Sequence, residues 1–426
     1  MVKQKNSSIF RSICTLLLGN SIGKLIGFLS IPIIAKLYSP DEIGVLSLFT
    51  SSVNILVVFS TLKYCLAIPL ERIKINTIAF VYLCLAINMI VSLITFTIAL
   101  FFHSFIMNYL SIPNLVNYWP YIILSSFLIG VYETLENWNV QKRNFKAISQ
   151  TKISQSVFGN LSKIIFGLLN FKIPGLLFGQ IISQSGGIIP LAKDLPLRVK
   201  FFRIAIKNKL YLLKEHIDFP LYRLPSQLLL TFSLYFPIFF FNYSYGENIT
   251  GQLSMAFISL AIPISLIGQS ISQVYYAEIA KITRNAPKKI LELTNSIIIK
   301  LFLLSIPPTI ILYLFGENLF LLFFGQEWEI AGKLIETLSI SILFQFISSP
   351  LVNIFTVFSR QKELIFINLI RTILLILSFY LSYNYKLNYI QCTLVYTLVI
   401  SINYVYTIAR IYTVLRKEIK ENKNVI

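Results

Sequence analysis

Residues 16–49 read LLLGNSIGKLIGFLSIPIIAKLYSPDEIGVLSLF. The stretch begins with a long apolar run that contains one lysine, Lys24. It continues through a short polar turn at residues 38–42, and a second apolar run starts at Ile43. A helix that crosses a bilayer needs about 20 mostly apolar residues. The stretch therefore predicts two membrane spans joined by a tight turn.

The same layout returns about 205 residues later in the chain. Tyr243-Ser244 lies six residues after Pro237, as Tyr38-Ser39 lies six residues after Pro32. After the second polar turn, Gly251-Gln252-Leu253-Ser254 resembles Gly44-Val45-Leu46-Ser47. This spacing predicts a chain built twice from one structural unit.

The whole chain has the composition of an integral membrane protein. Of its 426 residues, 56% are hydrophobic, and the mean hydropathy is +0.73. We expect an all-α polytopic membrane protein with twelve transmembrane helices in two pseudo-symmetric six-helix bundles. The predicted spans are residues 13–37, 43–69, 76–102, 118–139, 153–171, 173–192, 218–241, 251–277, 294–315, 331–357, 364–384 and 388–412.

The basic residues predict the orientation of these spans. Most of the 37 Lys and Arg fall in the two tails and in alternate loops, which is typical of the cytoplasmic side. The opposite loops hold only Lys36, Lys172, Lys333 and Lys386. Both termini are therefore expected in the cytoplasm. The predicted division is an N-terminal bundle at 1–192, a basic cytoplasmic connector at 193–217 that lies at the inner leaflet, and a C-terminal bundle at 218–426.

Several classes of function are disfavoured by the residues present. The net charge of +19 is explained by membrane topology, so we expect no nucleic-acid partner. No phosphate-binding G-x-x-x-x-G-K-[ST] motif is found, so ATP is not the direct energy source. The four cysteines fall in apolar runs, and His103 and His216 stand alone in the sequence. We therefore expect no cofactor, no metal site and no catalytic residues. The first span reads as an uncleaved helix.

Six basic residues fall inside the predicted spans. A Lys or Arg at the centre of a membrane helix costs about 2.5–3.5 kcal/mol, so six facing lipid would be prohibitive. The six candidate substrate-binding residues are Lys24, Lys63, Lys163, Arg223, Lys300 and Arg371. Lys24 and Lys163 lie near mid-membrane, and we expect them to face a polar interior. The other four lie close enough to the cytoplasmic ends to line the cavity or to snorkel to the surface.

Acidic residues that could balance these charges are few. Glu133 and Glu136 share one face of the fourth span, and Asp218 opens the seventh. They are candidates for pairing with the lysines or for binding a coupling cation, either a proton or sodium. The predicted interior is net positive, which favours an anionic, phosphorylated cargo. Gly19, Gly23 and Gly27 form a row of small residues that predicts close approach by a neighbouring helix.

Several short segments, taken in their order and spacing, resemble one known family. They are Lys36-Leu37-Tyr38-Ser39-Pro40 with Glu42-Ile43-Gly44, Thr61-Leu62-Lys63-Tyr64 with Ala67-Ile68, Asp218-Phe219-Pro220, Pro263 through Ser272-Gln273, and Phe324-Gly325-Gln326-Glu327-Trp328 with Ala331-Gly332. The sequence resembles the bacterial polysaccharide flippases, the O-antigen and capsule repeat-unit translocases of the multidrug/oligosaccharidyl-lipid/polysaccharide exporter superfamily.

The resemblance implies a V-shaped fold of two bundles around a central cavity. It implies transport of an undecaprenyl-pyrophosphate-linked oligosaccharide from the inner to the outer leaflet of the bacterial inner membrane. Alternating access driven by an ion gradient is the implied mechanism. Membrane lipid, a polymerase and a chain-length protein are the implied partners.

Three other readings stay open at this point. A multidrug or small-solute antiporter of the same superfamily would favour a cavity rich in acids. A major-facilitator transporter would carry a G-x-x-x-D-R-x-G-R-R loop after the second span, where this chain has Glu71-Arg72-Ile73-Lys74. A membrane polysaccharide polymerase or ligase would be expected to carry a large outer loop with catalytic Arg or His.

Overall fold

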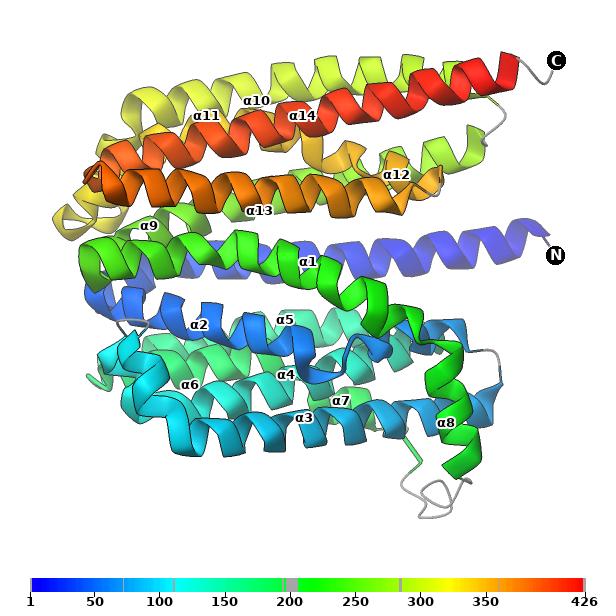
Figure 1. The fold of residues 1–426 in the computed structure, drawn as a ribbon, viewed down its shortest axis with the longest axis horizontal. Helices are drawn as coiled ribbons and strands as arrows, with labels where there is room; N and C mark the ends of the chain where they lie inside the picture. Colours follow the sequence, from blue (N-terminus) through cyan, green and yellow to red (C-terminus); the bar gives the residue numbers. More distant parts are fainter. Residues whose placement is uncertain are drawn as a thin grey trace. The chain divides into compact units, whose positions relative to one another are not determined.

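A computed structural model describes residues 2–71, 73–109, 112–193, 195–196, 206–282, 286–358 and 360–423. All regular elements in this part of the chain are helices (Figure 1). In chain order they are α1 (Val2–Leu37), α2 (Pro40–Ser60), η1 (Tyr64–Leu70), α3 (Lys74–Tyr109), η2 (Pro113–Tyr118), α4 (Trp119–Gln141), α5 (Phe145–Leu168), α6 (Lys172–Ser185), α7 (Ile188–Ala192), α8 (Ile206–Glu215), η4 (Phe219–Arg223), α9 (Leu224–Ile282), α10 (Pro287–Phe324), η5 (Gln326–Trp328), α11 (Glu329–Leu351), α12 (Asn353–Val357), α13 (Gln361–Asn384) and α14 (Tyr389–Lys423).

The predicted all-α polytopic class is confirmed. Among the described residues, 10 segments are long and apolar enough to cross a membrane. One of them, residues 219–266, holds the predicted seventh span and part of the eighth, and its helix is broken at Gly246, where φ is 84°. The predicted fifth span corresponds to the helix α5. This helix is not one of the 10 segments, because its polar side chains make it less apolar than they are.

The chain divides into two compact units, Met1–Tyr243 and Ser244–Ile426. The boundary falls within α9, three residues before the break at Gly246. The division predicted at the connector, residues 193–217, stays a prediction. Figure 1 shows each unit as a set of long helices that lie side by side.

The row of glycines on α1 is the surface on which α5 packs. A Cβ at Gly19 would overlap Ser149, and one at Gly23 would meet the backbone of Lys152. The hydroxyl of Ser156 donates a hydrogen bond to the Gly23 carbonyl at 2.6 Å. Small residues therefore let the two helix backbones approach closely, as the spacing of the row predicts.

The polar turn between the first two spans is a helix cap. The Ser39 hydroxyl accepts a hydrogen bond from the Glu42 amide at 3.4 Å, and the Glu42 carboxylate accepts one from the Ser39 amide at 3.0 Å. Pro40 occupies the first helical position, where no amide hydrogen is needed. This reciprocal capping box satisfies two backbone donors and fixes the start of α2.

The end of the second span differs from the prediction. α2 ends at Ser60, not at residue 69, and the chain then turns through Leu62 and Lys63, whose φ angles are 49° and 60°. These left-handed conformations cannot continue a right-handed helix. The following residues form the separate helix η1, which contains Pro69. Lys63 therefore lies in a turn and not inside a helix.

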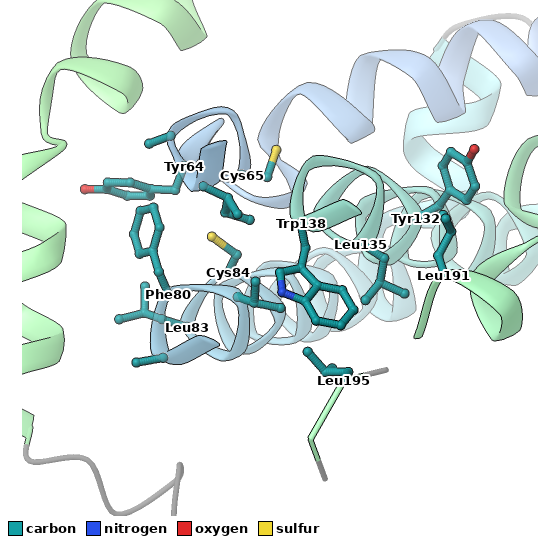
Figure 2. Packing of buried hydrophobic residues seen from close by; sticks show 14 of the residues in the cluster. Tyr64, Cys65, Phe80, Leu83, Cys84, Tyr132, Leu135, Trp138, Leu191 and Leu195 are labelled. Carbon is teal, nitrogen blue, oxygen red and sulfur yellow. The ribbon is translucent and has the colours of Figure 1, made fainter. Parts of the chain in front are cut away.

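A buried cluster joins η1, α3 and α4 to the connector. Figure 2 shows Tyr64 beside Phe80, and Trp138 of α4 close to Leu195. Leu212 of α8 belongs to the same cluster and is only 2% exposed. The connector was expected to lie at the inner leaflet. That position stays a prediction. The last helix of the connector packs on the first unit through Leu212, and much of the rest lies outside the described residues.

The second unit is built around α10, α11, α13 and α14. Gly316 and Gly332 face each other across α10 and α11, and a Cβ at Gly332 would lie 2.5 Å from the Glu317 Cα. The side chain of Gln252 accepts a hydrogen bond from the Ala331 amide at 2.9 Å. It also donates one to the carbonyl of Glu327. The segment after the break in α9 is thus tied to the start of α11.

Candidate functional site

The nine candidate residues are distributed over both compact units. Lys24, Lys63, Glu133, Glu136, Lys163, Asp218 and Arg223 belong to the first unit, and Lys300 and Arg371 belong to the second. Burial and partners separate eight of them into three groups: two buried cations without a described carboxylate partner, three members of ion pairs, and three exposed charges. The ninth, Lys24, is half-buried.

Lys163 is buried in the packing between α5 and α6. The residue is 8% exposed, and its Nζ donates a 2.6 Å hydrogen bond to Oε1 of Gln180. Gly179 makes room for this side chain, because a Cβ there would overlap the Lys163 Cγ. The Tyr38 hydroxyl donates to the Lys163 carbonyl at 2.7 Å. Among the described residues, the ammonium group has this neutral amide as its partner and forms no ion pair.

Lys24 lies on α1, next to Gly23 of the row that contacts α5, and it is half-buried. It is therefore placed on the same pair of helices as Lys163.

Arg371 is the corresponding buried cation of the second unit. It lies on α13, is 8% exposed, and its guanidinium carbon is 5.8 Å from the centre of the Tyr404 ring on α14. Its Nε is buried and has no hydrogen-bond partner in the part of the chain that the structure describes. No carboxylate among the described side chains pairs with it. An arginine held against an aromatic face keeps its planar donors available for a further partner.

Lys63 and Glu133 form an ion pair. Lys63 Nζ lies 3.3 Å from Glu133 Oε2, and the two side chains are 9% and 30% exposed. The left-handed backbone of Lys63, described above, turns its side chain toward α4. The pair therefore links the turn after α2 to α4 and neutralises one of the predicted cations.

Glu136 pairs with a residue that the sequence did not single out. Lys152 of α5 lies 3.0 Å from the Glu136 carboxylate, and its ammonium is 4.7 Å from the Tyr132 ring centre. Lys152 lies just before the predicted fifth span, residues 153–171, but α5 begins at Phe145 and already includes it. The sequence shows the polar side chains of this helix, but it does not predict that they contact α4.

Arg223, Lys300 and Asp218 are exposed within their units. Asp218 precedes η4 and makes no side-chain hydrogen bond to the start of that helix. Within each unit, the described residues show no hydrogen bond or ion pair between these three side chains and the buried cation of that unit. Glu133 and Glu136 of α4 both form ion pairs with lysines. The buried charges that lack a described carboxylate partner are therefore positive, and they are Lys163 and Arg371.

Solved structures with the same fold are membrane transporters. An inward-facing multidrug resistance MATE family transporter of the MOP superfamily matches with a TM-score of 0.70 at 14% identity, covering 95% of this chain and 96% of that one. The lipid II flippase MurJ, in an inward closed conformation, matches with a TM-score of 0.72 at 15% identity, covering 93% and 87%. A MOP superfamily transporter from Pyrococcus furiosus gives 0.60 at 14% identity, covering 95% and 96%. The chain therefore shares the fold of these solved structures.

A family assignment follows from the sequence profile described as "Polysaccharide biosynthesis protein", which matches residues 33–333. That range is more than half of the chain, and the protein belongs to this polysaccharide biosynthesis family. No curated protein matches it in sequence. The resemblance to polysaccharide flippases of the MOP superfamily, drawn from the segments beginning at Lys36, is confirmed at the level of family and fold.

Proposed function

We propose that this protein is a flippase for an undecaprenyl-pyrophosphate-linked oligosaccharide repeat unit. It would carry the repeat unit from the inner to the outer leaflet of the bacterial inner membrane, with both of its own termini in the cytoplasm. Membership of a polysaccharide biosynthesis family and a transporter fold support a role in moving a glycan precursor. The observation that carries the choice of an anionic cargo is the buried cation Arg371.

A buried guanidinium without a carboxylate is costly, because its charge and donors are removed from water. Arg371 has an Nε with no hydrogen-bond partner among the described residues, and its guanidinium lies near the ring of Tyr404. Phosphate oxygens suit arginine particularly well, since the planar fork of donors forms two parallel hydrogen bonds with them. A pyrophosphate headgroup would supply the missing partner during transport.

Lys163 supports the same class of cargo from the first unit. Its hydrogen bond to the neutral Gln180 leaves the positive charge uncompensated. Lys24, half-buried on the helix that packs against α5, is assigned the same role. Arg223 and Lys300, which are exposed, would bind lipid headgroups or the cargo at the edge of its path. This division of roles is part of the proposal.

For the ion coupling, Glu133 is the leading candidate. It is 30% exposed while its partner Lys63 is 9% exposed, so a cation from solution reaches the acid more readily than the lysine. A proton or sodium ion at Glu133 would release Lys63 and change the charge of the interior. Glu136 and Asp218 are the further candidates for this role.

The direct test uses purified protein in liposomes that contain an undecaprenyl-pyrophosphate-linked oligosaccharide. Movement between leaflets is followed by the fraction of oligosaccharide that an added, membrane-impermeant glycosidase cleaves. We expect protein-dependent movement that accelerates under a proton or sodium gradient. Absence of movement, together with efflux of small organic cations by the same vesicles, would overturn the proposal in favour of a multidrug antiporter. Cleavage or joining of glycan chains by the protein itself would favour the polymerase or ligase reading.

A cellular test addresses the place of the protein in its pathway. Loss of the gene in the native bacterium should remove surface polysaccharide, while lipid-linked repeat units accumulate on the inner leaflet. A polymerase and a chain-length protein are the partners expected to act on the exported unit. Accumulation of single repeat units already at the cell surface would instead assign the defect to polymerisation.

A further inference from the structure

A cluster of three side chains of types that can ligate a metal lies outside the nine candidate residues discussed above. Glu71, Glu215 and His216 offer ligand atoms that all lie within 4.8 Å of one another. Glu71 follows η1, Glu215 is the last residue of α8, and His216 comes next. His216 Nε2 lies 2.7 Å from Glu71 Oε1. Two segments far apart in the sequence thus meet where the connector docks on the first unit.

We propose that Glu71, Glu215 and His216 bind a divalent transition-metal ion, with Zn²⁺ as the best fit, and that the ion fastens the connector to the first unit. This inference is independent of the proposed flippase function. It concerns how α8 is held and not what the protein transports.

The ligand set suits such an ion. One imidazole and two carboxylates form a nitrogen and oxygen set that Zn²⁺ accepts, and water completes the coordination. Imidazole is a poor ligand for Mg²⁺ and Ca²⁺, which prefer oxygen alone. Two neighbouring carboxylates repel each other, and Glu215 has no ion-pair partner among the described side chains. A doubly charged cation would balance both acids.

The two ligand-bearing segments are held in place by contacts that do not involve the ligand atoms. The Tyr64 hydroxyl donates to the Leu213 carbonyl at 3.3 Å, and Gln141 donates to the Glu71 carbonyl at 3.2 Å. The His216 ring packs 5.2 Å from the centre of the Phe80 ring. The centre of the His216 ring also lies 6.2 Å from the centre of the Phe219 ring. The site is therefore largely organised before any ion arrives, which lowers the entropic cost of binding.

The distances between the ligand atoms need to change only slightly to fit a tetrahedral Zn²⁺ ion. Around a tetrahedral Zn²⁺ with bonds of about 2.0–2.1 Å, two ligand atoms lie about 3.3 Å apart. The Glu71–His216 pair, at 2.7 Å, must open by about half an ångström to reach that separation. Glu215 is exposed, so its side chain can rotate toward the other two without displacing packed atoms.

The sequence alone predicts no metal site, because His216 has no ligand-type partner at a characteristic spacing. The partner Glu71 lies 145 residues away in the chain. Only the docking of α8 against η1 and α3 brings the two together.

Purified protein tests the proposal through Zn²⁺ affinity, measured in competition with a fluorescent chelator, and through the absorption spectrum of bound Co²⁺. We expect one saturable site per chain. His216→Ala and Glu71→Gln should weaken Zn²⁺ binding by at least about tenfold, and Glu215→Gln should weaken it as well. His103→Ala is the matched control and should bind like the native protein, since His103 lies on α3 against Trp119. Mg²⁺ should not compete.

Glu215→Gln keeps the test decisive even if the other variants fold poorly, because Glu215 is exposed. The proposal is overturned if the native protein shows no saturable Zn²⁺ binding, or if both His216→Ala and Glu215→Gln bind as tightly as the native protein. A thiolate-to-cobalt absorption band would move the site to the cysteines and would also overturn it.

Discussion

Lys63 Nζ lies 3.3 Å from Glu133 Oε2, and this ion pair joins the turn after α2 to the neighbouring helix α4. Lys63 reaches its partner from a left-handed backbone conformation, with φ at 60°. Such a conformation costs about 1–3 kcal/mol in a residue other than glycine, so surrounding contacts must hold it. The pair with Glu133 is one of those contacts, and it ties a strained turn to the acid proposed for coupling.

Breaking this pair should destabilise the protein. Lys63→Met and Glu133→Gln should each lower the free energy of unfolding by about 1–2 kcal/mol, because each leaves a poorly solvated charge without its partner. The double variant should lose less than the sum of the two. Denaturant unfolding in detergent measures all three. As a control, the more exposed pair Lys152–Glu136 should give smaller losses. Strictly additive losses at Lys63 and Glu133 would contradict the coupling.

The glycine beside Lys163 offers a test of the packing in the first unit. A Cβ at position 179 would overlap the Lys163 Cγ, so Gly179→Ala should cost about 1–3 kcal/mol of stability. Gly268→Ala is the control, because no atom lies within 4 Å of the added Cβ there. That helical substitution should be neutral or stabilising by up to about 1 kcal/mol. Equal effects of the two substitutions on the melting temperature would show that the α5–α6 packing described here is wrong.

Replacing Lys163 separates stability from transport. Lys163→Met keeps a long unbranched side chain, one atom shorter, and removes a buried charge, so the unfolding free energy should stay the same or rise. Transport of the lipid-linked oligosaccharide in liposomes should fall by about tenfold, the worth of one charge-assisted hydrogen bond. Unchanged transport by a well-folded Lys163→Met protein would remove this lysine from the proposed cargo path.

Substitutions of Arg371 should reduce transport more than the substitution of Lys163. Arg371→Gln should reduce transport by about tenfold or more, and Arg371→Lys should restore only part of it, because lysine cannot form the two parallel hydrogen bonds of a guanidinium. Lys362→Gln, which removes an exposed charge from the same helix, is the matched control and should have little effect. If Lys362→Gln and Arg371→Gln reduced transport equally, net charge and not a specific site would explain the result.

The sequence predicted the helices more fully than the partners of their charged residues. The capped turn at Ser39 and the glycine row from Gly19 were readable because both depend on local spacing. The depth of Lys63 and Arg371 in their predicted spans left snorkelling and burial as equal alternatives, and the structure buries both. Depth along a helix does not say which face meets a neighbour, and that face decides burial.

The sequence by itself determined that the chain is an all-α membrane protein. Apolar runs of sufficient length partition into a bilayer, and their backbones must form helices, whatever the rest of the chain does. Only the tertiary structure decided which charges are neutralised: Glu133 meets Lys63 across 70 residues, and Glu71 meets His216 across 145. Such pairs depend on where helices cross, and crossing points are set by the packing of side chains that no local spacing encodes.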